Sequence, residues 1–408
     1  MPRLVTAQAP CRPAPYVALR SRRGLLSSQS ETPDAFSVVH NVPNVVVQQR
    51  DRCHTDFGGP QMYSKDGENY FIVDAHIALW DGRPENQRNI HGKQFIDCFY
   101  DYHRNLSPEA EVWSYEDYLY QGGERLMRDM FADGIVDHAI FQPARLAEFY
   151  HRGFGQTDEA STLAAQHPDK LTYNHYFDPR DGERGLDQLR ADAERFGLKG
   201  VKLYTADWHG DSRGWKLSDP MAYRYFELCR ELGIRNIHVH KGPTIRPLDR
   251  DAFDVADIDH AATDFTDLNF IVEHVGLPRL EDFCWIATQE PNVFGGLAVA
   301  MPFIHTRPRY FAQIIGELLY WIGEDRILFS SDYALWTPQW LIEKFVDFQI
   351  PEDLVEYSPI STEVKKKVLG LNAAKLYDIP VPAALQLPDA AETDTGPRQP
   401  AAADLAMA

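Results

Sequence analysis

The chain has 408 residues, of which 44% are hydrophobic and 25% are charged, a composition that excludes a largely disordered or collagen-like protein. Its 41 Lys and Arg against 60 Asp and Glu give a net charge of −19, which argues against nucleic acid as the main partner and favours a small-molecule substrate. The length fits two average domains or one decorated α/β barrel.

The five cysteines are scattered and form no CxxC pair, so the sequence predicts neither a disulfide framework nor a thiolate zinc site and indicates a reducing compartment. The mean hydropathy is −0.40, and no apolar run approaches the roughly 18 residues that a membrane helix needs. We therefore expect a cytoplasmic protein that has neither a membrane nor a nucleic-acid partner.

Both ends of the chain differ in composition from the rest. Residues 1–30 contain five arginines and no acidic residue, which is typical of a transit peptide and equally of a translated upstream region. The segment 380–408 is rich in Ala, Pro, Asp and Thr and has no apolar period. We predict a disordered segment over 1–35, a barrel domain over 36–379 and a disordered tail over 380–408.

Between the two ends, eight short β-rich runs alternate with amphipathic helical windows. The predicted strands are Tyr70–Ala78, Ile135–Gln142, Leu171–Phe177, Lys199–Tyr204, Arg235–His240, Leu268–His274, Asn292–Val299 and Arg326–Ser331. The clearest helical windows are Glu183–Phe196, Asp219–Leu232, Pro278–Glu290 and Tyr310–Gly323. Eight such units most economically close into a (β/α)8 TIM barrel, and a doubly wound open sheet is the alternative.

One connection, from Leu79 to about Gly134, is far longer than a usual βα loop and is rich in aromatic residues. This insertion after the first strand predicts a lid or a subunit contact, and the second possibility favours a homodimer or a larger homo-oligomer. No glycine-rich phosphate loop is present, so the sequence gives no positive signal for nucleotide binding.

Polar residues interrupt the apolar strands where the strands end. They are Asp74 and His76 in FIVDAHIALW, His240 in NIHVHKG, His274 in FIVEHVG and Asp332 in ILFSSDYAL. A barrel brings the carboxyl ends of its strands to one face, so residues distant in sequence converge there. Carboxylate oxygen and neutral imidazole suit one divalent ion, and we interpret the set as a mononuclear metal site.

These motifs resemble the amidohydrolase superfamily, and within it the amidohydrolase-related branch that includes the metal-dependent decarboxylases of aminocarboxymuconate semialdehyde and of hydroxybenzoates. The resemblance spans roughly residues 71–379 and depends on the order of the motifs. They are DAH, LKGVKLY, IHVHKG, EHVG, GEDRILFSSDYAL and GLNAAKLYDI. The resemblance implies a TIM barrel with a metal-dependent active site.

The first motif departs from the usual HxH of the superfamily, because Ala78 stands two residues after His76. The pattern DAHIA is similar to the acid-x-His-x-Ala of hydroxybenzoate decarboxylases, in which the acidic residue takes the ligand role. The resemblance therefore implies Asp74, His76, His240 and Asp332 as metal ligands. It leaves His274 to move protons, with Asp332 as the second catalytic residue.

Further residues near the strand ends have two interpretations each. We consider Lys202, His175, Trp80 and Trp336 as substrate-binding candidates, against an internal salt bridge for Lys202, an internal hydrogen bond for His175 and loop packing for the two indoles.

Two polar neighbours of the site residues are interpreted as structural. His238 shares a strand face with His240 but lies deeper in the barrel, so we assign it to the core. Glu273 precedes His274, and strand alternation predicts that it points away from the site, so we exclude it from catalysis.

Three functions follow from this interpretation. The first is nonoxidative decarboxylation of an aromatic or unsaturated carboxylic acid, and the second is hydrolysis of an amide, ester or lactone by a metal hydroxide. The third is a non-catalytic accessory protein of an oxygenase system. Because two carboxylates and two imidazoles make a borderline-hard set, we expect Zn2+ first and Mn2+ or Fe2+ as alternatives.

Overall fold

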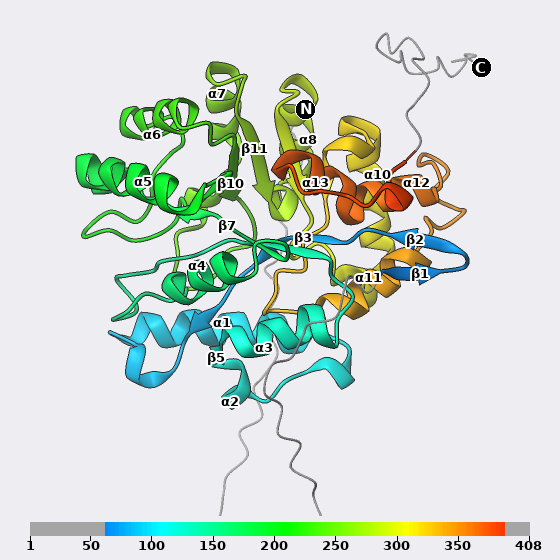
Figure 1. The fold of residues 1–408 in the computed structure, drawn as a ribbon, viewed down its shortest axis with the longest axis horizontal. Coiled ribbons are helices and arrows are strands. Elements are labelled where there is room, and N and C mark those ends of the chain that lie inside the picture. The colour runs from blue at the N-terminus through cyan, green and yellow to red at the C-terminus, as the bar shows by residue number, and fades with distance from the viewer. Residues whose placement is uncertain (1–61, 388–408) are drawn as a thin grey trace, which may run out of the picture. The chain divides into compact units, whose positions relative to one another are not determined.

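The computed structural model describes residues 62–387, so the prediction for residues 1–35 and most of the tail predicted over 380–408 lie outside the described part of the chain. The first residues of that tail are described: a short 3-10 helix covers Ala383–Leu385, and Leu385 is buried. Parallel strands form the centre of the molecule (Figure 1). They are β3 (Val73–Ile77), β6 (His138–Phe141), β7 (Leu171–Tyr173), β8 (His175–Tyr176), β9 (Gly200–Leu203), β10 (Asn236–His240), β11 (Asn269–Glu273), β12 (Val293–Gly296) and β13 (Ile327–Leu328). All eight predicted strand regions are confirmed.

These strands close into a barrel. One run pairs in the order β3–β6–β7, and the other runs from β8 to β13 in chain order. Only Asn174 separates β7 from β8. On the other side, the Ala75 N–H donates to Phe329 O at 3.0 Å and the Ala78 N–H donates to Tyr333 O at 2.6 Å, which joins β3 to the chain that follows β13. The predicted TIM barrel is confirmed.

Helices follow the strands and cover them from outside (Figure 1). They are α4 (Thr157–Gln166), α5 (Gly182–Phe196), α6 (Pro220–Glu231), α7 (Ala256–Asp264), α8 (Leu280–Gln289), α9 (Phe303–Thr306), α10 (Pro308–Ile322), α11 (Pro338–Asp347), α12 (Thr362–Lys366) and α13 (Asn372–Tyr377). Local signals set their ends: α6 begins at a proline in its first turn, and α5 ends where Gly197 takes a φ of +60°. The four predicted helical windows are confirmed.

The insertion after β3 has secondary structure of its own. It contains β4 (Trp80–Asp81), α1 (Ile90–Leu106), α2 (Tyr115–Tyr118), β5 (Tyr120–Gln121) and α3 (Gly123–Met127), and a hairpin of β1 (Tyr63–Lys65) and β2 (Glu68–Tyr70) precedes β3. The imidazole of His103 in α1 holds the insertion to the barrel, because its Nδ1 lies 2.6 Å from Leu335 O and its Nε2 accepts from the Trp113 N–H at 2.9 Å. The insertion therefore lies against the loop that follows the last strand.

Alternation along β10 shows how the sequence divides its side chains between two environments. Ile237 and Val239 are fully buried in the main hydrophobic core, whereas His238 and His240 stand on the other face, in the barrel interior. A buried strand with polar residues at every second position therefore delivers polar groups to the barrel axis.

Within residues 62–387, no helix has both the length and the apolar character that crossing a membrane requires.

Asp137, just before β6, generates a prediction about stability. Its side chain is 6% exposed, its Oδ2 accepts from the Ile72 N–H at 2.9 Å, and burial raises its pKa to about 6. A raised carboxyl pKa means that the folded state holds a proton which the unfolded state releases, so stability falls as pH rises from about 4 to about 6. Asp137→Asn removes this loss and keeps an acceptor for Ile72.

We expect the unfolding free energy of Asp137→Asn to match wild type near pH 4 and to exceed it by about 2–3 kcal/mol at pH 7. Urea unfolding of both proteins at several pH values measures the difference. A difference that does not change with pH would contradict the role of Asp137.

Candidate active site

Four of the predicted site residues meet at the carboxyl ends of the strands. His274 Nε2 lies 2.8 Å from His240 Nδ1, and His274 Nδ1 lies 3.7 Å from Asp332 Oδ2. On the other side of this carboxylate, His76 Nε2 lies 3.5 Å from Asp332 Oδ1. All four side chains are buried, so the structure brings together groups from β3, from β10 and from the segments that follow β11 and β13.

The backbone turns sharply at two of these residues. His274 has a φ of +65° and Asp332 a φ of +61°, a region that residues other than glycine rarely occupy. The ring of His274 also approaches a glycine, because a Cβ on Gly242 would stand 2.4 Å from His274 Cδ2. Such conformations cost of order 1–3 kcal/mol each and concentrate at functional sites, where the surrounding structure fixes them.

Asp74 lies beside His76 in sequence but makes different contacts. Its Oδ1 accepts from the Ser331 N–H at 2.9 Å and from the His76 N–H at 3.2 Å, while its Oδ2 is buried without a partner in the described part of the chain. Burial raises the pKa of Asp74 to about 7, although the bonds from Ser331 act in the opposite direction. One oxygen of this carboxyl group therefore holds the backbone, and the other is free.

Glu273 belongs to the same cluster, and the prediction that it points away from the site is wrong. Its side chain is fully buried, with Oε2 3.0 Å from His76 Nδ1 and Oε1 2.5 Å from His238 Nδ1. Alternation failed because the strand ends at Glu273 and His274 turns into the left-handed region. Gly296 of β12 pairs with Glu273 and leaves space for its carboxylate, a contact between strands that no local pattern in the sequence shows.

The charges in the cluster are set by burial and by neighbours. Burial lowers the pKa of His240 and of His274 well below its ordinary value, so both imidazoles are neutral. Burial raises the pKa of Asp332, against the effect of His76 and Lys202. Burial alone would also raise the pKa of Glu273, but His76, Lys202 and His238 together hold it well below its ordinary value.

A small cavity of about 40 Å3 opens beside these groups, which is room for a few water molecules. Its polar lining consists of His76, Gln142, Lys202, Tyr204, His240, His274 and Asp332. Its apolar walls include Trp80, Phe99, Tyr102, Phe154, Ile245 and Leu335. Lys202 Nζ is buried there and has no hydrogen-bond partner within residues 62–387, which marks it as the cation that faces the cavity.

The other substrate-binding candidates are placed differently. Trp80 lines the cavity, whereas Trp336 is fully buried and is absent from its lining. His175 Nδ1 lies 2.8 Å from Asp192 Oδ2, and the ring lines a separate surface pocket beside α5.

A divalent ion fits the donor types of the cluster. Asp74 Oδ2, His240 Nε2 and His274 Nδ1 are buried and without partners among the described residues. As the side chains stand, however, no three His, Cys, Asp or Glu residues between 62 and 387 are gathered into a sphere that could hold an ion. The hydrogen bond between His240 and His274 occupies two of the available nitrogen atoms.

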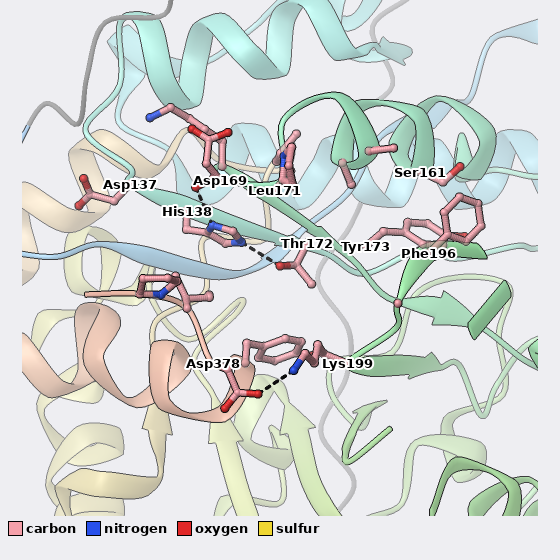
Figure 2. Close-up of a pocket in the computed structure, with 18 of the residues that line it drawn as sticks. Asp137, His138, Ser161, Asp169, Leu171, Thr172, Tyr173, Phe196, Lys199 and Asp378 are labelled. Atoms are coloured by element: carbon pink, nitrogen blue, oxygen red, sulfur yellow. Dashed lines mark hydrogen bonds and ion pairs between the residues drawn. The ribbon is translucent and has the colours of Figure 1, made fainter. Parts of the chain in front are cut away.

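A larger cavity of about 620 Å3 lies elsewhere, against β6, β7 and the start of β9 (Figure 2). The basic groups labelled there have partners: His138 contacts Asp169 O at 3.1 Å and Thr172 Oγ1 at 2.8 Å, and Lys199 Nζ lies 2.7 Å from Asp378 Oδ2. Burial lowers the pKa of His138 to about 4. The smaller cavity, with its unpaired lysine and its imidazole nitrogens without hydrogen-bond partners among the described residues, is therefore the candidate active site.

Two buried lysines provide a matched test of this assignment. Burial lowers the pKa of Lys202, although Glu273 and Asp332 act in the opposite direction, so its charge costs folding free energy. Lys241 is equally buried but pairs with Asp257 at 2.7 Å. We expect the unfolding free energy of Lys202→Met to be at least that of wild type, and that of Lys241→Met to fall by about 3–5 kcal/mol because the buried Asp257 carboxylate loses its cation.

Thermal and urea unfolding of the two variants measure this difference. A large loss of stability in Lys202→Met would show that Lys202 supports the fold and would remove it from the site.

Comparison with known proteins places the chain in a family. The amidohydrolase family model matches residues 73–379, and no curated protein matches the chain significantly. Similar solved structures include an uncharacterized TIM-barrel protein from Bordetella bronchiseptica, with 19% identity and a TM-score of 0.58, which covers 76% of this chain and 98% of that one. An amidohydrolase from Burkholderia multivorans with bound zinc has 15% identity and a TM-score of 0.50, and covers 76% and 100%.

A 5-carboxyvanillate decarboxylase from Novosphingobium aromaticivorans with bound manganese has 17% identity and a TM-score of 0.49, and covers 76% of this chain and 97% of that one. At such identities, structural likeness shows the fold alone. The family model, in contrast, matches the chain from the first barrel strand to the end of the last helix, and this range includes the residues of the candidate site. The chain belongs to the amidohydrolase family.

Proposed function

We propose that the protein is a metal-dependent enzyme that removes carbon dioxide from an aromatic or unsaturated carboxylic acid without oxidation. The observation that carries the proposal is Lys202, a buried ammonium group with no partner in the described chain, which faces a cavity with aromatic walls. An unpaired buried cation is costly unless an anion joins it, and a substrate carboxylate provides that anion.

The residues that would hold the ion are Asp74, His76, His240 and Asp332. The bare Asp74 Oδ2 and His240 Nε2 atoms support this assignment, and so do the neutral imidazoles. A divalent ion bound there supplies an electrophile that stabilises negative charge on the substrate. We propose Zn2+ first and Mn2+ or Fe2+ as alternatives; the zinc of the Burkholderia multivorans amidohydrolase supports this order.

The side chains around the cavity divide the remaining work. Lys202 binds and orients the carboxylate, and the walls of Trp80, Phe99 and Tyr102 contact a planar ring and exclude water. The carbon atom that loses carbon dioxide needs a proton. His274 Nδ1 lies 3.7 Å from Asp332 Oδ2, so these two proposed catalytic residues are close enough to hold and move that proton.

Substrate entry requires movement of the insertion. A cavity of about 40 Å3 is too small for an aromatic acid, and Phe99 and Tyr102 from α1 form part of its wall. Tyr102 Oη donates to Thr244 O at 3.2 Å, which connects α1 to the loop that follows β10. We propose that α1 acts as the lid, and that breaking this contact opens the site.

Hydrolysis of an amide, ester or lactone is the second candidate. The neutral His274 beside Asp332 favours it, because a neutral imidazole can accept a proton from an attacking water.

We further propose a cytoplasmic homodimer or larger homo-oligomer. Two exposed aromatic residues support the assembly: Trp285 of α8 is 58% exposed and Tyr320 of α10 is 64% exposed.

The test begins with elemental analysis of protein purified without chelators. We expect about one divalent ion per chain, lost in His240→Ala and in Asp332→Asn together with activity. His274→Ala should keep the ion and lose about 10²- to 10⁴-fold in turnover, because its role is proton transfer.

Release of carbon dioxide from a panel of aromatic carboxylates, measured beside hydrolysis of amides and lactones, decides between the two reactions. Asp137→Asn, remote from the cavity, serves as the control for both assays. Wild-type protein that binds no ion even after reconstitution would contradict the proposal.

A further inference from the structure

Behind the candidate site, a series of buried polar contacts runs through the barrel. His76 Nδ1 lies 3.0 Å from Glu273 Oε2, and Glu273 Oε1 lies 2.5 Å from His238 Nδ1. Tyr377 Oη of α13 lies 2.7 Å from His238 Nε2, and Asn174 Nδ2 donates to Tyr377 Oη at 2.8 Å. All five side chains are buried, and the series connects the last helix to His76 at the cavity.

The donor and acceptor types give this series one direction. The Glu273 carboxylate can only accept, so both imidazoles that face it must present an Nδ1 hydrogen. His238 Nε2 is then bare and accepts from the Tyr377 hydroxyl, as its position requires. In a neutral His76 ring with its hydrogen on Nδ1, the lone pair is on Nε2, and this atom faces the Asp332 carboxylate at 3.5 Å. Two acceptors that face each other at this distance need a cation or a proton between them.

The contact between His76 and Glu273 is short but not linear. At 3.0 Å the two atoms are within hydrogen-bond distance, yet neither makes a well-aligned bond to any described residue. Glu273 therefore fixes the side of the His76 ring that carries the hydrogen, and it leaves the exact ring angle to the groups in the cavity.

Two glycines on neighbouring strands make room for the series. A Cβ on Gly296 of β12 would stand 2.4 Å from Glu273 Oε2, and a Cβ on Gly200 of β9 would stand 2.5 Å from Tyr377 Oη. Any other residue at either position would displace a member of the series. The backbone of the neighbouring strands therefore leaves space for Glu273 and for Tyr377.

We propose that Glu273 is a positioning residue, supported by His238 and Tyr377, that holds His76 with its Nδ1 hydrogen inward and its Nε2 lone pair toward the cavity. The inference rests on the proposed function in that the exposed lone pair serves as a ligand. It extends that function by assigning the reason why His76 can bind an ion at all. Partners that orient a ligating histidine in this way typically change metal affinity by 10- to 100-fold.

The first test removes the charge of Glu273. In Glu273→Gln one carboxylate oxygen becomes an NH2 donor, so the amide can no longer accept from both Nδ1 hydrogens. We expect Zn2+ to bind at least 10-fold more weakly, measured by competition with a chelator, with a thermal unfolding curve that shows a folded protein. Asp137→Asn makes the same chemical change at a buried carboxylate away from the series and should keep wild-type affinity.

The second test moves Glu273 without changing its charge. Gly296→Ala places a methyl group against Glu273 Oε2, whereas Gly295→Ala places the same group against Val275 Cγ1 and Phe283 on the other strand face, at 3.1 and 3.3 Å. We expect Gly296→Ala to weaken Zn2+ binding as Glu273→Gln does, and Gly295→Ala to leave it within about threefold of wild type. Equal effects of the two alanines would indicate general disturbance of β12 and would overturn the proposal.

A measurement without metal separates this inference from the proposed function. Nitrogen-15 spectra of histidine-labelled apo-protein report which nitrogen of each ring carries hydrogen. We expect the Nδ1–H form for His76 in wild type and loss of that preference in Glu273→Gln. An Nε2–H form of His76 in wild type would overturn the inference. Failure of wild type to bind any ion would overturn the proposed function alone, because the ring state is still measured.

Discussion

The closure of the barrel between β3 and the segment after β13 determines where the chemistry lies. Two backbone hydrogen bonds, from Ala75 to Phe329 and from Ala78 to Tyr333, join the first and the last strand. Without this closure, His76 and Asp332, which are more than 250 residues apart in the sequence, would stand at opposite edges of an open sheet. Asp74 takes part in the same junction, because its Oδ1 accepts from the Ser331 N–H. One carboxyl group thus contributes to closure and also lies next to the candidate site.

The barrel interior contains charge that an apolar core would not tolerate. Lys202, Glu273 and Asp332 are all buried. Lys202 lowers the pKa of both carboxyl groups and they raise the pKa of Lys202, whereas Glu273 raises the pKa of Asp332. Burial still dominates for Lys202 and Asp332, whereas Glu273 gains enough from His76, Lys202 and His238 to stay ionised. The neighbouring carboxylates therefore offset only part of the cost of burying the Lys202 charge, and an anion that binds beside Lys202 would offset more of it.

Much of the fold was predictable because its signals are local. Buried parallel strands are continuous apolar runs, and the helices between them carry apolar stripes such as Phe311, Ile314, Ile315 and Leu318 on α10. The polar residues at strand ends were equally visible, and the structure brings His76, His240, His274 and Asp332 together. These features depend on the spacing of residues along one strand or helix, and this spacing follows directly from the sequence.

The orientation of individual side chains was decided elsewhere. By itself, the sequence determined the order of eight βα units and the residue types at their ends, because both follow from short-range periodicity. The tertiary structure decided that Glu273 faces His76, since His274 leaves the strand with a positive φ and Gly296, on another strand, provides the space. It also decided that Trp336 lies outside the cavity lining and that His175 pairs with Asp192. Each of these outcomes depends on contacts between segments far apart in the chain, and no local pattern records them.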